Sequence, residues 1–222
     1  IIQCCEHLSE VLQPIFNPIG FKAKAKQFLF EKSLGSFELM RAELEIKFNA
    51  ERVTVKAEDG VNLDCLYIPA FGKREENSHP LTLFCNPNAG YYEFSFYQSE
   101  WIEYYTNLGI NLFLWNYRGY GLTKGWPNPI RLQKDGLIIS EYLREVRNID
   151  KLGVHGERLG GSSATYIANN ARVDFLFADR TFSSLDKVAK FNFGGVAEFV
   201  FRIITRWNKT TVNDYLSAPC FK

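Results

Sequence analysis

Residues 152–170 read LGVHGERLGGSSATYIANN, and this stretch decides the fold. Its first part, Leu152–His155, is a short apolar run typical of a buried strand, and Ser162–Asn170 has the length and composition of a helix. Three glycines surround the junction between them: Gly156, Gly160 and Gly161. Because glycine has no side chain to clash, the chain can turn sharply there. The sequence therefore predicts a tight strand–turn–helix unit with Arg158 in the turn.

Apolar runs of the same kind recur along the chain and predict further buried strands. They are Leu81–Cys85, Ile110–Tyr117, Leu152–His155 and Val173–Ala178. Helix-length segments separate these runs, and Arg131–Arg147 is the clearest of them. Upstream, the alternating residues of Val53–Ala57 and Leu63–Tyr67 flank a turn and predict an antiparallel hairpin. The expected fold class is α/β, with a leading antiparallel hairpin, a mostly parallel sheet and helices on both faces.

Composition excludes several classes of partner and cofactor. The 222 residues carry 26 Lys plus Arg against 25 Asp plus Glu, a net charge of +1, so no basic field favours nucleic acid, and membrane contact is not indicated. The five cysteines and three histidines are scattered without a CxxC pair, so we expect no metal site, no cofactor and no disulfide framework. Reduced thiols place the protein in an intracellular compartment, cytoplasmic or organellar.

Besides the Gly156–Gly161 turn, four further stretches each lie at the expected end of a predicted strand. They are Glu58–Leu63, Cys85–Glu93, Asn116–Gly121 and Asp179–Leu185. Over about residues 50 to 217 the chain resembles the α/β-hydrolase-domain family, in particular its intracellular serine lipases and thioesterases. The resemblance implies that the turn Gly156–Glu157–Arg158–Leu159–Gly160 corresponds to the nucleophile elbow, G-x-S-x-G, of that family. It also implies that Asn88 and Leu159 correspond to the residues whose N–H groups form the oxyanion hole.

The chain departs from the family pattern at the residue that carries the chemistry. Arg158 occupies the position of the nucleophilic serine, and a guanidinium stays protonated and cannot attack a carbonyl carbon. The resemblance places the acid and the histidine of the triad after later strands, and this chain contains neither at a matching position. Ser162 and Ser163 lie one turn further along the helix and are poor substitutes. We therefore expect no catalytic residue in this chain.

The side chain of Arg158 needs an explanation, because the elbow of the family points this residue into the active-site cleft. We expect an ion pair with a carboxylate, first with Asp179 at the end of the neighbouring strand and second with Glu157. The alternative is that Arg158 and the amides at the start of the helix bind an anion such as a phosphate or a carboxylate.

The chain is expected to divide into a helical N-terminal extension, residues 1–48, and a partial α/β-hydrolase domain, residues 49–222, without the last strands. The strand Val173–Ala178 is too apolar for a sheet edge, so either more chain follows Lys222 or a partner covers it. Phe191–Trp207 lies where the family carries lid helices, and it forms a lid, a partner-binding helix or a helix packed on the sheet.

These observations predict a catalytically inactive relative that serves as a scaffold or as a subunit of a larger assembly with protein partners. Two alternatives stay open. The chain is an active lipase, esterase or thioesterase if it continues and Arg158 is not the native residue. It is a non-catalytic anion-binding module if Arg158 binds a ligand.

Overall fold

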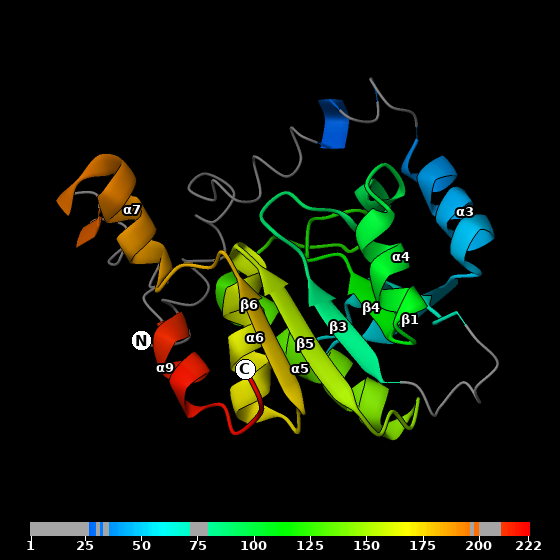
Figure 1. Cartoon of the computed structure of the whole chain (residues 1–222). Helices are drawn as coiled ribbons and strands as arrows, with labels where there is room; N and C mark the ends of the chain where they lie inside the picture. The colour runs from blue at the N-terminus through cyan, green and yellow to red at the C-terminus, as the bar shows by residue number, and fades with distance from the viewer. Residues whose placement is uncertain (1–26, 30–31, 33–35, 72–79, 196–197, 200–209) are drawn as a thin grey trace.

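The structure is a computed structural model that describes residues 27–29, 32, 36–71, 80–195, 198–199 and 210–222. Within these residues the strands form one six-stranded sheet in the order β1-β2-β4-β3-β5-β6 (Figure 1). The strands are β1 (Glu51–Lys56), β2 (Asn62–Ile68), β3 (Leu81–Cys85), β4 (Asn111–Trp115), β5 (Leu152–Glu157) and β6 (Phe175–Asp179). The four apolar runs and the hairpin predicted from the sequence are therefore all strands of a single sheet.

The strand pairing confirms a mostly parallel sheet with a leading antiparallel hairpin. β1 pairs antiparallel with β2, and β2 pairs antiparallel with β4. β4, β3, β5 and β6 are parallel to one another, with Leu81 opposite Leu152 and His155 opposite Phe177. In parallel strands the carboxyl ends meet at one edge of the sheet, so the loops that follow β3, β4, β5 and β6 lie near one another.

Helices cover both faces of the sheet. They are α3 (Phe37–Phe48), η2 (Tyr92–Phe96, a 3-10 helix), α4 (Glu100–Asn107), α5 (Pro129–Glu145), α6 (Leu159–Asn170), α7 (Leu185–Phe193) and α9 (Thr211–Ser217). Figure 1 shows α5 and α6 behind the sheet and α4 in front of it. The larger core cluster includes Ile139 of α5 and Ile167 of α6, and the smaller one includes Ile102 of α4.

Two helices begin earlier than the sequence pattern predicts, and local capping explains one of them. α5 begins at Pro129, two residues before Arg131, because the Asn128 side chain accepts a hydrogen bond from the Ile130 N–H at 2.9 Å. Proline is also favoured at the first helical position, where its missing N–H costs no hydrogen bond. α6 begins at Leu159 rather than Ser162, so the turn between β5 and α6 is shorter than expected.

Helix α3 lies within the stretch predicted to be a helical extension, and it packs as part of the body of the protein. Its predicted apolar side is buried: Phe37, Met40, Leu44 and Phe48 are each at most 4% exposed. The first two belong to the larger core cluster and the last two to the smaller one, together with sheet residues. Residues 1–26 lie outside the described part of the chain.

The free edge of β6 is paired at one point with the end of the chain. Phe221 forms a parallel bridge with Phe175, through a hydrogen bond from the Leu176 N–H to the Phe221 carbonyl at 2.8 Å. From the sequence, either more chain or a partner was expected to cover β6; within the described residues the one isolated bridge to it comes from Phe221. The side chains of Phe175, Phe177 and Phe221 remain 40%, 45% and 73% exposed. Phe191–Trp207, for which a lid, a partner-binding helix or a helix packed on the sheet was expected, lies mostly outside the described residues.

Truncation of one α3 side chain tests whether this helix is part of the fold. Leu44 is fully buried, whereas Ile46 on the same helix is 80% exposed. We expect Leu44→Ala to lower the free energy of unfolding by about 2–5 kcal/mol, because it leaves a cavity between α3 and the sheet. Ile46→Ala should change it by less than about 0.5 kcal/mol. Urea denaturation of the two variants measures this, and equal, small effects would contradict the described packing.

Candidate functional site

The turn between β5 and α6 has the strained backbone of an elbow. Arg158 has φ 52° and ψ −108°, a conformation that non-glycine residues adopt at a cost of about 1–3 kcal/mol. Neighbouring segments stabilise it. The Arg158 N–H donates to the Asp179 carbonyl at 2.9 Å, and the Arg158 carbonyl accepts from the Thr181 hydroxyl at 2.8 Å and the Gly161 N–H at 3.2 Å. The turn is therefore fixed through backbone atoms of Arg158.

Two glycines of the turn are required by close approach rather than by their dihedral angles. A Cβ atom on Gly160 would lie 1.9 Å from the carbonyl oxygen of Cys85, and one on Gly156 would lie 2.5 Å from the carbonyl oxygen of Gly160. Real Cβ atoms do not approach this closely. The first contact joins the start of α6 to the end of β3, so the elbow lies directly against the loop that follows β3.

The side chain of Arg158 lies in solvent and not in a closed cleft, since it is 63% exposed. Its ion-pair partner is Glu157, with 3.7 Å between Arg158 Nε and Glu157 Oε1. Asp179, the first partner expected from the sequence, instead pairs with Arg180 at 2.8 Å. The reason is geometric: Arg180 follows Asp179 directly and also reaches Glu157 at 2.9 Å. Because the guanidinium is solvated, it has little need of a carboxylate partner.

The loop after β3 contains Asn88, which the resemblance matches to one oxyanion N–H. Within the described residues, neither the Asn88 N–H nor the Leu159 N–H donates to a protein acceptor. The loop turns through Ala89, whose φ is 54°, and is supported by Tyr120. The Tyr120 hydroxyl donates to Asn88 Oδ1 and accepts from the Ala89 N–H, each at 3.1 Å. Both amides are thus without a protein acceptor in the described part of the chain.

Tyrosines of the Asn116–Gly121 motif form hydrogen bonds with the loop after β3. Besides Tyr120, the buried Tyr117 donates its hydroxyl proton to the Asn86 carbonyl at 2.6 Å. Asn86 in turn donates from its side chain to the Trp115 carbonyl at 2.8 Å, which ties the loop to the end of β4. Residues of the Asn116–Gly121 motif therefore position the loop after β3.

His155 is the histidine nearest to the elbow in sequence, and it is half-buried on β5. It lies on β5 between the rings of Phe84 and Phe177, and its Nδ1 is 3.0 Å from the Tyr105 hydroxyl. Burial lowers the pKa of His155 to about 4, so the imidazole is neutral at physiological pH. Its Nε2 is buried, without a hydrogen-bond partner among the described residues. It therefore contacts neither Arg158 nor the candidate oxyanion loop.

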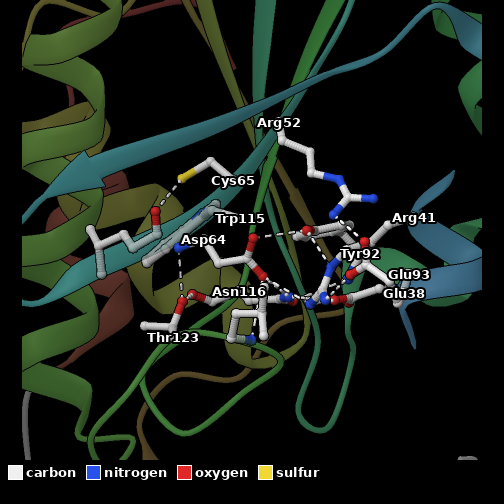
Figure 2. Close-up of polar contacts among 12 residues, drawn as sticks. Glu38, Arg41, Arg52, Asp64, Cys65, Tyr92, Glu93, Trp115, Asn116 and Thr123 are labelled. Carbon is white, nitrogen blue, oxygen red and sulfur yellow. Dashed lines mark hydrogen bonds and ion pairs between the residues drawn. The ribbon is translucent and has the colours of Figure 1, made fainter. Parts of the chain in front are cut away.

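The sequence did not reveal a group of charged side chains around Glu93, which follows the Asn88 loop and is shown in Figure 2. Glu93 is fully buried, and its carboxylate accepts from Arg41 of α3 and, at 3.0 and 3.1 Å, from the Asn116 side chain. Arg41 also contacts Asp64 of β2 at 3.1 Å and donates to the Tyr92 hydroxyl at 2.9 Å. These residues are far apart in sequence, and no local pattern distinguishes them from surface charges.

Two negative findings complete the description of the site. In the part of the chain that the structure describes, no three His, Cys, Asp or Glu side chains gather in a way that could hold a metal ion. Among the same residues, no helix combines the length and apolar character needed to cross a membrane.

Comparison with known proteins identifies the fold. No protein-family model matches the chain. It is similar to the protein bem46 of Schizosaccharomyces pombe, with 30% identity over 186 residues that cover 80% of this chain and 61% of bem46. It is also similar to the "Uncharacterized membrane protein YNL320W" of Saccharomyces cerevisiae, with 29% identity over 162 residues that cover 71% of this chain and 55% of that protein. The chain thus spans little more than half the length of these relatives.

A solved structure shows which fold the chain has. The crystal structure of an alpha-beta hydrolase from Vibrio vulnificus superposes with a TM-score of 0.64 at 23% sequence identity, over 87% of this chain and 72% of that one. At this identity the likeness shows the fold. The chain has the α/β-hydrolase fold, as the resemblance implied, and its elbow lies between the strand and helix where that fold carries its nucleophile.

A methyl group at Gly160 tests the contact between the elbow and β3. We expect Gly160→Ala to lower the free energy of unfolding by about 3 kcal/mol, because the new Cβ would force α6 away from the Cys85 carbonyl. Gly195→Ala is the matched control, since a Cβ there has no atom within 4 Å. Urea denaturation measures both variants. A Gly160→Ala protein as stable as the control would show that the contact is not made.

Proposed function

We propose that this α/β-hydrolase-fold chain is catalytically silent and serves as a scaffold, or as a subunit of a larger assembly. One observation carries the first part: Arg158 lies at the elbow position, with the strained φ of 52° that the fold reserves for its nucleophile. A guanidinium is not a nucleophile at any physiological pH. In serine hydrolases, loss of the nucleophile lowers turnover about 10⁶-fold, and oxyanion donors do not compensate for it.

Exposed aromatic side chains support the second part of the proposal. Phe175 and Phe177 lie on β6, the last strand of the described sheet, Phe221 stacks on Phe175 with ring centroids 5.8 Å apart, and Phe191 of α7 is 91% exposed. Grouped apolar side chains at a sheet edge favour burial against another polypeptide, because they are costly in water. We call Phe175, Phe177 and Phe221 the β6 patch. It is the surface through which we propose that the chain binds a protein partner.

The proposed assembly is intracellular, in the cytoplasm or an organelle. Cys65 and Cys85 are buried free thiols, and burial raises the pKa of Cys85 to about 12, which keeps this thiol protonated. Buried unpaired thiols are typical of reducing compartments. The name of the yeast relative YNL320W as a membrane protein favours an assembly at a membrane surface.

A fluorophosphonate probe tests the absence of a reactive serine. We expect no labelling of the protein purified from its native source, under conditions where an active serine hydrolase is labelled in parallel, because Arg158 leaves the elbow without a hydroxyl. Mass spectrometry of the digested protein locates any adduct. A labelled peptide that contains Ser162 or Ser163 would contradict the proposal, and loss of the label in Ser162→Ala or Ser163→Ala would identify the serine.

Substitution of the β6 patch tests the scaffold role. We expect Phe175→Ser combined with Phe177→Ser to lower the mass of the native complex to that of the free protein. Tyr104→Ser, at a side chain 65% exposed on α4, should leave that mass unchanged. Light scattering of the complex purified from its native source measures both. A complex that survives loss of the patch would contradict the assigned surface.

Anion binding by Arg158 is a second candidate function, and a separate observation favours it. The exposed guanidinium lies at the start of α6, and the N–H groups of Leu159 and Asn88 have no acceptor among the described residues. Calorimetric titration with phosphate and with acetate separates this candidate from the scaffold. Heat of binding that is present in the native protein and lost in Arg158→Ala would favour an anion-binding module.

A further inference from the structure

The group of charges described above lies where four parts of the protein meet. Arg41 comes from α3, Asp64 from β2, Tyr92 and Glu93 from η2, and Asn116 from the loop after β4, as Figure 2 shows. We call these five residues the buried cluster. The Tyr92 hydroxyl donates to Asp64 Oδ1 at 2.9 Å, and the Asn116 side chain donates to Asp64 Oδ2 at 3.0 Å. Asp64 and Glu93 therefore share two hydrogen-bond donors, Arg41 and Asn116.

The buried cluster holds more negative than positive charge when both carboxylates are ionised. Asp64 and Glu93 face one guanidinium, that of Arg41, whereas Tyr92 and Asn116 are neutral. The next charged groups are Glu38 of α3, which reaches Arg41 at 3.5 Å, and Arg52 of β1. Arg52 pairs with Glu38 at 2.5 Å and with Glu45, and in the described part of the chain it forms no ion pair with Asp64 or Glu93. One uncompensated negative charge in the interior is costly, and binding of one proton removes it.

Water has little access to this charge at Glu93, whose side chain is 0% exposed and covered by the loop after β4, whereas Asp64 is 12% exposed. A Cβ atom on Gly121 would lie 2.3 Å from Asn116 Nδ2 and 3.1 Å from Glu93 Oε1. The Leu122 N–H points at Asp64 Oδ2 at 3.4 Å, and Thr123 accepts from the Asp64 N–H at 2.9 Å. Hydration of Glu93 therefore requires movement of this loop, of η2 or of α3.

The buried cluster is mechanically connected to the loop that carries Asn88. Phe37 of α3 contacts the ring of Tyr91 at 5.1 Å between centroids, and Tyr91 contacts Tyr120 at 5.0 Å. The Tyr120 hydroxyl is bonded to Asn88 and Ala89. Displacement of α3 would thus reach the candidate oxyanion loop through these rings.

We propose that the buried cluster is a proton-operated latch: with a proton bound at Glu93 it holds α3 against residues 86–96, and release of that proton to solvent loosens this contact. The inference stands on the arrangement of charges and does not depend on whether the elbow is catalytic. Its direction follows from the chemistry of a buried carboxyl group.

The sign of the effect follows from the pKa of Glu93 in the folded and unfolded chain. Burial raises the pKa of Glu93 from 4.5 to about 7; Arg41 opposes this rise and Asp64 adds to it. A carboxyl group with a raised pKa binds its proton more tightly in the folded state. The stability that the proton provides is complete below pH 4.5 and is lost as the pH rises through 7. The latch is closed in mild acid and loosened in mild alkali.

Carboxyl-carbon NMR of the native protein labelled with ¹³C-glutamate tests the proton site directly. We expect one glutamate signal to titrate near pH 7, to be absent in Glu93→Gln, and to move to lower pH in Asp64→Asn, since the Asp64 charge no longer opposes ionisation. Glu100→Gln, at an exposed position on α4, is the control and should leave that titration unchanged. If no glutamate titrates between pH 6 and 8, the proposal is wrong.

Hydrogen exchange tests whether the proton controls the contact. After correction for the intrinsic rate, we expect amides of residues 37–48 and 86–96 to exchange about tenfold faster at pH 8 than at pH 6, the factor that a shift from 4.5 to about 7 implies. Glu93→Gln should abolish this pH dependence, and Glu100→Gln should retain it. A pH-independent exchange rate in the native protein would overturn the latch, even if Glu93 titrates as expected.

Discussion

The architecture depends on one close approach, between the first turn of α6 and the end of β3. There is no room for a side chain between Gly160 and the Cys85 carbonyl, so helix and strand are held at backbone contact. This contact fixes the start of α6, and with it the positive φ of Arg158, the direction of the Leu159 N–H and the position of the loop that contains Asn88. The geometry of a nucleophile elbow is thus produced by small residues around position 158 and not by the residue at that position.

A second constraint acts from the opposite side of the same loop. Arg41 of α3 forms ion pairs with two carboxylates, Asp64 from β2 and Glu93 from η2, which directly follows the loop. Removal of one partner of such a pair would leave a buried charge without compensation, and this is more costly than the pair is stabilising. The N-terminal helix is therefore part of the body of the domain, through its charges as well as through its apolar side chains.

The sequence was sufficient to predict the sheet, because buried parallel strands are continuous apolar runs and leave a clear pattern. Glycine spacing was sufficient to locate the elbow, since only close approach explains Gly156 and Gly160 together. Of the two carboxylates expected for Arg158, the structure pairs it with Glu157, the second candidate, whereas the carboxylate of Asp179 is bound by Arg180 next to it. The charges around Glu93 left no local signal, because their positions relative to one another are set by strand order and not by spacing along the chain. The bridge of Phe221 to β6 was missed for the same reason.

The elbow also bears on how such a protein changes during evolution. The hydrogen bonds that stabilise the turn use the backbone N–H and carbonyl of residue 158, and its side chain is in solvent with one ion contact of 3.7 Å. Selection on stability is therefore nearly blind to the identity of the side chain there. Arginine and serine codons can differ by a single nucleotide, and an exchange of the one side chain for the other would leave these backbone hydrogen bonds in place. Fold and chemistry drift independently at this position.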